Sequence, residues 1–185
     1  MPRTLHLIKH GRPRMVPGTP AHDWALAPDA LGDLPALIDR LRPHPELVVS
    51  SEEPKAVATA QALAAALGTP HRRMLGLHEH LRYTTGFVSP EAFQAQVDRF
   101  FREPGALVMG EESADDARTR FRNAVHAVMQ GNPQDTVAVV AHGTVISLLA
   151  AEGSGRDPAV LWRSLEFLGH VTLNWTAAAG RELRP

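Results

Sequence analysis

Two histidines, His10 and His142, stand where buried strands are expected to end, and a glycine follows each of them. The first comes after an apolar run over residues 4–8, the second after a β-branched run over residues 136–141. Open α/β sheets bind ligands at the carboxyl ends of parallel strands, so we expect both imidazoles at one sheet edge. The functional interpretation is a ligand pocket built around His10. The alternatives are a satisfied strand-end histidine and a passive helix cap.

Cationic side chains accompany the first histidine and the helix that follows the second expected strand. Lys9 precedes His10 and Arg12 follows it, so this loop is one candidate for local anion binding in a chain whose formal net charge is only −1. That net charge gives no general attraction for nucleic acid or for an anionic membrane. Lys55 falls in the first turn of a helix, where a positive charge opposes the helix dipole. We interpret it as a group retained to bind an anion, the alternative being a solvated surface lysine.

Glu79 is a third residue of interest. It follows a strand expected over Arg72–Leu77 and lies between His78 and His80. Taken alone, a glutamate in this position is more often a solvated loop residue. The three side chains from 78 to 80 are also suitable ligands for a divalent metal, although ligands so close in sequence need a partner elsewhere.

The elements that must position these residues alternate between strand and helix along the chain. The apolar patterns predict strands over residues 4–8, 47–50, 72–77, 136–141 and 170–175, and helices over residues 34–41, 51–67, 90–101, 114–128, 144–151 and 158–162. Gly68 is the expected end of the second helix, and Ser113 with Asp116 forms a near capping box at the fourth. This alternation is typical of an α/β fold.

Length and composition narrow the class of protein. The 185 residues suit a single domain over residues 1–185, and 44% of them are hydrophobic, which is ordinary for a globular protein. The absence of cysteine excludes disulfides, thiolate metal sites and a cysteine nucleophile. Neither a signal-peptide pattern nor an apolar run of membrane-spanning length is present, so we expect a cytoplasmic protein.

Four segments of the sequence together resemble the histidine phosphatase (phosphoglycerate mutase-like) superfamily. Lys9-His10-Gly11 resembles the family's Arg-His-Gly signature, and residues 50–60 resemble its Ser-x-x-x-x-Arg-Ala-x-x-Thr-Ala segment. The segment ending at Glu79 resembles its Leu-x-Glu, and His142 with its glycine resembles the second His-Gly. The resemblance runs from residue 5 to about residue 149. The chain is short and has no obvious long lid insertion, which favours the phosphatase branch over the mutases.

This resemblance implies a three-layer α/β/α sandwich whose central sheet is mostly parallel, with helices on both faces. It implies a metal-independent phosphomonoesterase without a cofactor, in which His10 becomes phosphorylated and Glu79 protonates the leaving alcohol. Glu79 would need a pKa near neutrality for this role. The implied phosphate-binding groups are Lys9, Gly11, Arg12, Lys55, His142 and Thr144. The expected partner is a small phosphorylated substrate, and phosphate or sulfate is expected to fit the same pocket.

The sequence departs from the family at two positions, because Lys9 and Lys55 stand where arginine is expected. They are the only lysines among nineteen basic residues, which argues against chance. Arginine grips two phosphate oxygens with a planar fork, whereas lysine offers a compact charge. We therefore expect from the resemblance a phosphatase with altered preference or weakened turnover or, alternatively, a phosphate-binding regulatory module. The loops over residues 13–24 and 82–89 are expected to set specificity, but their sequences identify no substrate and indicate no oligomeric state.

Overall fold

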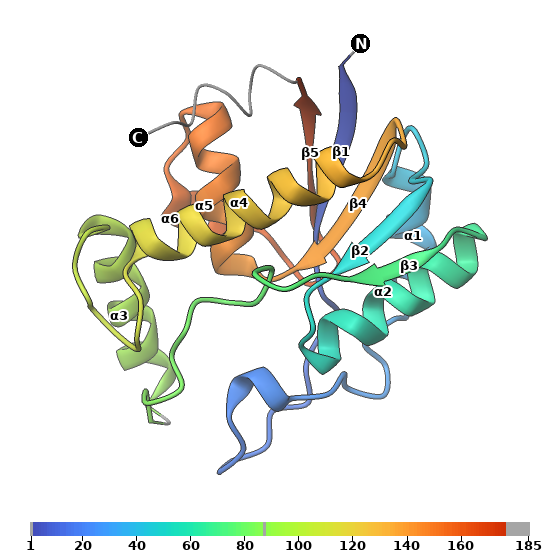
Figure 1. Cartoon of the computed structure of the whole chain (residues 1–185). Coiled ribbons are helices and arrows are strands. Elements are labelled where there is room, and N and C mark those ends of the chain that lie inside the picture. Colours follow the sequence, from blue (N-terminus) through green and yellow to red (C-terminus); the bar gives the residue numbers. More distant parts are fainter. Residues whose placement is uncertain (1, 87, 177–185) are drawn as a thin grey trace.

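The protein is built on one mixed sheet. Its strands are β1 (Arg3–Lys9), β2 (Leu47–Ser50), β3 (His71–Arg73), β4 (Thr136–Ala141) and β5 (His170–Trp175). A computed structural model describes residues 2–86 and 88–176, and over these residues the strand order is β3-β2-β4-β1-β5 (Figure 1). Neighbouring strands are parallel except for the last pair, β1 and β5. The prediction of a mostly parallel sheet is confirmed.

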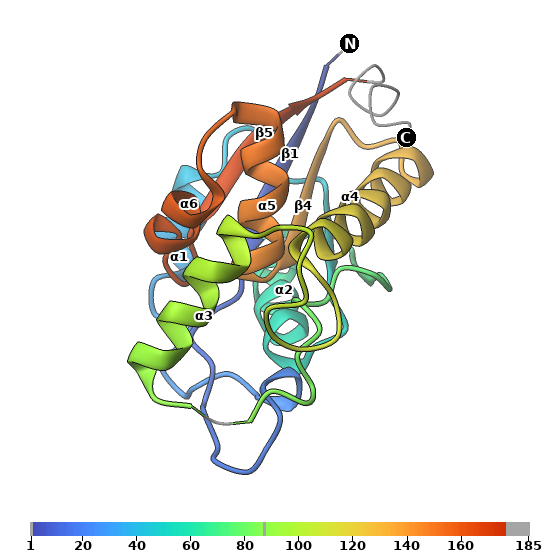
Figure 2. The same ribbon diagram turned by 90° about the vertical axis from the view of Figure 1, so that its left-hand side faces the viewer.

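Helices cover both faces of this sheet. They are α1 (Leu34–Arg40), α2 (Pro54–Leu67), α3 (Pro90–Arg102), α4 (Ala114–Gly131), α5 (Gly143–Ser154) and α6 (Pro158–Ser164), with a short 3-10 helix, η1, at Ala21–Asp23. α1 and α2 pack on one face, and α4, α5 and α6 pack on the other, with α3 beside α6 (Figures 1 and 2). This is the predicted three-layer α/β/α arrangement. Within the described residues, no helix is both long enough and apolar enough to cross a membrane.

The core lies on both sides of the strands. In β4, Val137 and Val139 belong to the cluster under α3, α4 and α5, whereas Ala138 and Val140 belong to the cluster under α1 and α2. Successive side chains of a strand point to opposite faces, so a strand buried on both faces needs apolar residues throughout. This explains why the sequence shows continuous apolar runs here rather than alternation.

Local signals fix the ends of two helices as predicted. Gly68 caps α2 in the left-handed conformation, at φ 66°. At the start of α4 the Ser113 hydroxyl accepts the backbone N–H of Asp116, and the Asp116 carboxylate accepts the backbone N–H of Ser113. Ser113 therefore acts as a helix cap, as the sequence indicates.

The third strand is shorter than predicted. The pattern predicts a strand over residues 72–77, but β3 covers only His71–Arg73. The chain leaves the sheet after Met74, whose N–H donates to Ser50, and turns at Gly76 with φ 83°. Gly76 packs against α4, because a Cβ added to Gly76 would lie 3.0 Å from the Cβ of Ala124. This turn redirects the chain that carries Glu79.

Some predictions extend beyond what the structure describes. The predicted single domain includes residues 1, 87 and 177–185, and the predicted specificity loop over residues 82–89 includes residue 87. All of these positions lie outside the described residues.

Candidate active site

The two parallel central strands bring the two histidines together. β1 and β4 pair with Lys9 opposite Ala141, so the residue after each strand lies at the same sheet edge. There the ring centroids of His10 and His142 are 5.1 Å apart, in an edge-to-face arrangement. Both side chains are buried. The prediction that they share one edge of the sheet is confirmed.

A cavity of about 220 Å³ opens at this edge. Six of the eight predicted site residues line it, and they come from β1, the start of α2, the loop after β3 and the start of α5: Lys9, His10, Lys55, Glu79, His142 and Thr144. The sequence segments singled out above therefore converge in space.

His10 is held as a neutral imidazole with a defined orientation. Its Nδ1 lies 2.7 Å from the carbonyl oxygen of Gly11, and a carbonyl only accepts, so Nδ1 carries the proton. Burial, together with the facing His142 and Lys55, lowers the pKa of His10 to about 3. At neutral pH its Nε2 is therefore the unprotonated nitrogen with a free lone pair.

Gly11 does not line the cavity, but it shapes the turn that presents His10. A Cβ at this position would lie 2.9 Å from the carbonyl oxygen of Ala30, closer than side chains approach backbone. The Gly11 N–H donates to the Thr59 hydroxyl at 3.0 Å, which ties the turn to α2. Its predicted phosphate contact remains a prediction.

His142 is also neutral and fully buried. Its pKa is lowered to about 3, chiefly by burial. The charge of Lys55 lowers it further, whereas the charge of Glu79 raises it. Its Nε2 lies 2.8 Å from the Ser51 hydroxyl and 3.3 Å from a carboxylate oxygen of Glu53. Its Nδ1 is buried without a hydrogen-bond partner among the described residues.

Glu79 is a carboxylate fixed by backbone N–H groups. One oxygen accepts the N–H of His80 at 2.9 Å, and the other accepts that of Thr144, at the N-terminus of α5, at 3.2 Å. Burial alone would raise the pKa of Glu79, but Arg82, His142 and these two N–H groups lower it to about 2. The sequence-based expectation of a pKa near neutrality is therefore wrong for the unliganded site, because groups from distant elements stabilise the charged form.

Both lysines at the cavity already have partners. Lys9 donates to the carbonyl oxygen of Leu165 at 2.8 Å and lies 4.6 Å from the ring centroid of Phe167, and burial lowers its pKa. Lys55 donates to the carbonyl oxygen of Ala21 at 2.8 Å and forms an ion pair with Glu53. Lys55 is only 5% exposed, which excludes the alternative of a solvated surface lysine.

Arg12 is not among the residues that line the cavity. Its side chain is exposed and forms an ion pair with Asp29. Arg12 would have to leave this partner to reach a phosphoryl group beside His10, so its phosphate-binding role remains a prediction.

Glu53 and Arg82 line the cavity but were missed by sequence reasoning. Glu53 reads as part of a polar helix start, and no pattern shows that its side chain turns inward. Arg82 stands three residues after Glu79, in a loop without periodicity, and its guanidinium lies 5.1 Å from the ring centroid of Phe93. The one sequence feature that could have indicated Arg82 is that it is a cationic residue close in sequence to Glu79.

The alternative metal site around Glu79 is not formed by the described residues. His80 directs Nε2 at the carbonyl oxygen of Glu112, 2.8 Å away, and its ring packs on Phe100. The Nδ1 of His78 lies 2.9 Å from the carbonyl oxygen of Glu79. Over residues 2–86 and 88–176, no group of three or more histidine, aspartate or glutamate side chains is arranged to hold a metal ion.

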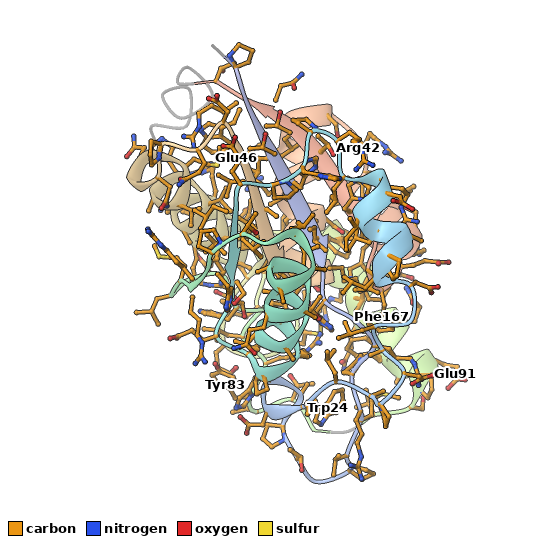
Figure 3. All side chains as sticks on the ribbon, turned by 90° about the vertical axis from the view of Figure 1, so that its right-hand side faces the viewer. Trp24, Arg42, Glu46, Tyr83, Glu91 and Phe167 are labelled. Carbon is orange, nitrogen blue, oxygen red and sulfur yellow. The ribbon has the colours of Figure 1, made fainter. Side chains whose placement is uncertain are left out.

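Aromatic side chains form much of the remaining cavity wall. Trp24 and Tyr83 lie at the end of the molecule away from Arg42 and Glu46, as Figure 3 shows. The aromatic lining residues beyond the histidines are Trp24, Tyr83, Phe93, Trp162 and Phe167. The cavity therefore has a charged end at the strand termini, where Phe167 lies against Lys9 and His10, and further aromatic side chains in its wall.

Comparisons with solved structures show proteins of the same fold. One is a mycobacterial glucosyl-3-phosphoglycerate phosphatase in complex with inorganic phosphate, with 26% identity and a TM-score of 0.69 over 93% of this chain and 89% of that chain. A second is a phosphoserine phosphatase variant from Entamoeba histolytica in complex with phosphoserine, with 16% identity and a TM-score of 0.74 over 94% and 91%. A third is the alpha-ribazole phosphatase from Shigella flexneri, with 16% identity and a TM-score of 0.69 over 94% and 91%.

Sequence comparison gives the family directly. A search of curated proteins finds no significant match. The sequence profile of the histidine phosphatase superfamily (branch 1), however, matches residues 5–181, which include every site residue named above. Because this match spans nearly the whole chain, the protein belongs to the histidine phosphatase superfamily.

Proposed function

We propose that the protein is a metal-independent phosphomonoesterase that works through a phosphohistidine on His10. The observation that carries this proposal is the tautomer of His10. With Nδ1 bound to the carbonyl oxygen of Gly11 and the pKa lowered to about 3, Nε2 is an unprotonated nucleophile in a cavity lined by cations. Covalent catalysis then splits the displacement at phosphorus into two easier steps.

The charged end of the cavity supplies groups for a phosphoryl group. Lys9, Lys55 and Arg82 provide positive charge, and His142 provides a second imidazole beside His10. Such groups stabilise the charge that spreads over the equatorial oxygens when the phosphoryl group is transferred. Each lysine must exchange part of its present contacts for phosphate oxygens.

Glu79 acts as the proton carrier in this proposal. It reaches the cavity at the N-terminus of α5 and is a carboxylate before substrate binds. A negatively charged phosphoryl group next to it disfavours the carboxylate and raises its pKa. The protonated acid then donates to the leaving alcohol oxygen, and the carboxylate later removes a proton from the attacking water.

The substrate is a small phosphate monoester whose leaving group lies against the aromatic side chains of the cavity wall. The structural relatives support a small phosphorylated ligand, because one was solved with inorganic phosphate and another with phosphoserine. Planar aromatic side chains such as Trp24 and Tyr83 offer large contact areas for an apolar or ring-containing leaving group.

One observation favours a second candidate, a phosphate-binding module with weak or no turnover. Both lysine ammonium groups are already engaged, and the Glu53 carboxylate occupies part of the charged end. A site with this internal pairing binds phosphate less strongly than one with free arginines.

Hydrolysis of nitrophenyl phosphate in the presence of a chelator separates these candidates. The wild-type chain is expected to turn over, while His10→Ala loses activity by at least about a hundredfold. His44→Ala, at an exposed histidine, is the matched control and should behave as wild type. Acid-labile phosphate on His10 after rapid quenching would identify the intermediate. Unchanged activity in His10→Ala would refute the proposal, and an inert wild type that binds phosphate would favour the module.

A further inference from the structure

Glu53 brings a buried carboxylate into the cavity beside the two histidines. Its Oε2 forms an ion pair with the Lys55 ammonium. Its Oε1 lies 3.3 Å from Nε2 of His142 and accepts the backbone N–H of Glu79 at 2.9 Å. The Glu53 side chain is only 9% exposed, so solvent screens its charge weakly. A negative charge therefore lies among the groups that would hold phosphoryl oxygens.

The charges of the cavity lining largely cancel. The cationic residues are Lys9, Lys55 and Arg82, and the carboxylates are Glu53 and Glu79. The lowered pKa values of His10, His80 and His142 keep these imidazoles neutral, so the five charged groups leave one net positive charge. That charge matches a phosphoryl group that carries one negative charge and leaves a doubly charged group only half neutralised.

We propose that Glu53 makes this site select phosphoryl groups with a single negative charge, such as the monoanion of a phosphate monoester, over doubly charged ones. A protonated phosphoryl oxygen donates a hydrogen bond to a carboxylate, whereas an unprotonated oxygen is repelled by it. Glu53 is positioned for this discrimination because it lies between Lys55 and His142. The binding preference stands by itself, and its catalytic consequence rests on the proposed function.

The same preference supplies the proton that the leaving group needs. A monoanionic ester arrives with one proton on its phosphoryl group, and Glu79 arrives without one. As Nε2 of His10 bonds to phosphorus, the ester P–O bond breaks and the phosphoryl proton passes through Glu79 to the alcohol oxygen. His10 keeps its Nδ1 proton, so the products are a neutral alcohol and a phosphohistidine of net charge −1. Water then attacks phosphorus, its proton passes through Glu79 to the phosphate, and monoanionic phosphate leaves neutral His10.

Several titratable or charged groups surround Glu53. Glu53 lines the cavity described above and also a second cavity of about 220 Å³, and the titratable or charged residues of both linings are Lys9, His10, His22, Asp23, Glu52, Lys55, His78, Glu79, His80, Arg82, Tyr83 and His142. A positive charge gained by any of these groups toward about pH 5 attracts doubly charged sulfate more than singly charged phosphate, so their titration works against the expected preference and cannot produce it. Sulfate keeps two negative charges between about pH 5 and about pH 8, whereas phosphate gains its second charge within this range. Comparing the two anions therefore isolates the charge of the ligand.

The test measures binding of sulfate and of inorganic phosphate to the full chain by calorimetry at about pH 5 and about pH 8. In wild type, the affinity for phosphate relative to sulfate should be at least about tenfold higher at the lower pH. Glu53→Gln keeps the acceptor for the Glu79 N–H but removes the charge, so sulfate should bind about tenfold more tightly and the pH effect should shrink. Glu53→Asp should retain the preference. Glu52→Gln, at the exposed neighbouring carboxylate, is the matched control and should bind both anions as wild type does.

Two results would overturn the proposal. One is a wild type that binds sulfate as tightly as phosphate at about pH 5, which needs no variant and so stands even if Glu53→Gln does not fold. The other is a Glu53→Gln variant that binds both anions more weakly, which would make Glu53 a positioning residue for Lys55. None of these measurements requires turnover, so a failure of the proposed phosphatase function appears separately in the His10→Ala assay.

Discussion

The guanidinium of Arg120 forms an ion pair with the carboxylate of Glu112 directly behind the loop that carries Glu79. Arg120 also donates to the backbone carbonyl oxygens of Gly76, His78 and Glu79, at distances of 2.8, 2.9 and 3.1 Å. One side chain of α4 thus holds three backbone carbonyl groups of this loop. The position of the candidate acid depends on a pair that does not touch the cavity.

The first prediction is that Arg120→Gln lowers kcat by at least about tenfold with a smaller effect on KM, because Glu79 loses its position rather than its charge. The loss should be larger for alkyl phosphates than for nitrophenyl phosphate, a difference that general destabilisation does not produce. Breaking the pair should also reduce the free energy of unfolding by about 3 kcal/mol. Arg118→Gln, in an exposed pair on the same helix, is the control. Equal losses on both substrates would argue against a positioning role.

The second prediction concerns Glu79 itself. Glu79→Gln keeps the shape but removes proton transfer, and its single amide oxygen accepts only one of the two N–H groups, of His80 and Thr144, that the carboxylate binds. The kcat/KM of alkyl phosphates should fall by about a hundredfold or more and that of nitrophenyl phosphate by about tenfold or less, because kcat/KM reports the phosphorylation step, in which nitrophenolate leaves without protonation. Steady-state kinetics on the two substrates measures this ratio. A uniform loss would show that Glu79 has another role.

Much of the fold followed from local patterns. Continuous apolar runs predicted the strands that end at Lys9 and Ala141, and their parallel pairing places His10 and His142 together. Two helix ends could also be predicted, because Gly68 ends α2 through its own backbone conformation and Ser113 begins α4 through its own side chain. These features depend on a few adjacent residues, which is why sequence was sufficient.

The pKa of Glu79 and the position of Glu53 could not be predicted from local patterns. The low pKa of Glu79 depends on Arg82 and on the N-terminus of α5, which is far away in sequence. The inward turn of Glu53 depends on the extended backbone of a helix cap, and the length of β3 depends on how Gly76 packs against α4. Such contacts form only when elements distant in sequence meet in the fold, so local sequence patterns do not reveal them.

The third prediction addresses the two lysines. The cavity is packed around their ammonium groups, because a Cβ at Gly143 would lie 3.4 Å from Nζ of Lys9, and Lys55 contacts both Ala21 and Glu53. A guanidinium is larger and planar, so the double variant Lys9→Arg, Lys55→Arg should lower kcat/KM by about tenfold. Each single variant, measured on nitrophenyl phosphate, shows which position has less room. An increase in kcat would instead mean that the lysines weaken an ordinary arginine site.

The fourth prediction follows from the two buried neutral imidazoles. His10 and His142 each have a pKa of about 3 in the folded protein, against 6.5 for an ordinary histidine. Between these values the unfolded chain binds more protons than the folded one, so stability rises with pH through this window. Their contribution is complete above about pH 6.5 and is lost as the pH falls toward about 3. Each pKa unit corresponds to about 1.4 kcal/mol, so the combined loss amounts to several kcal/mol.

Urea denaturation of wild type and His142→Gln at about pH 7 and about pH 5 measures this effect. The variant lacks one of the two groups, so its free energy of unfolding should fall less between the two pH values, by about 1 to 2 kcal/mol. Its absolute stability is not the readout, because the substitution also removes the contact with Ser51. His44→Gln, at an exposed histidine, should keep the wild-type slope. Identical slopes in wild type and His142→Gln would contradict the prediction, because they would mean that the pKa of His142 is the same in the folded and the unfolded protein.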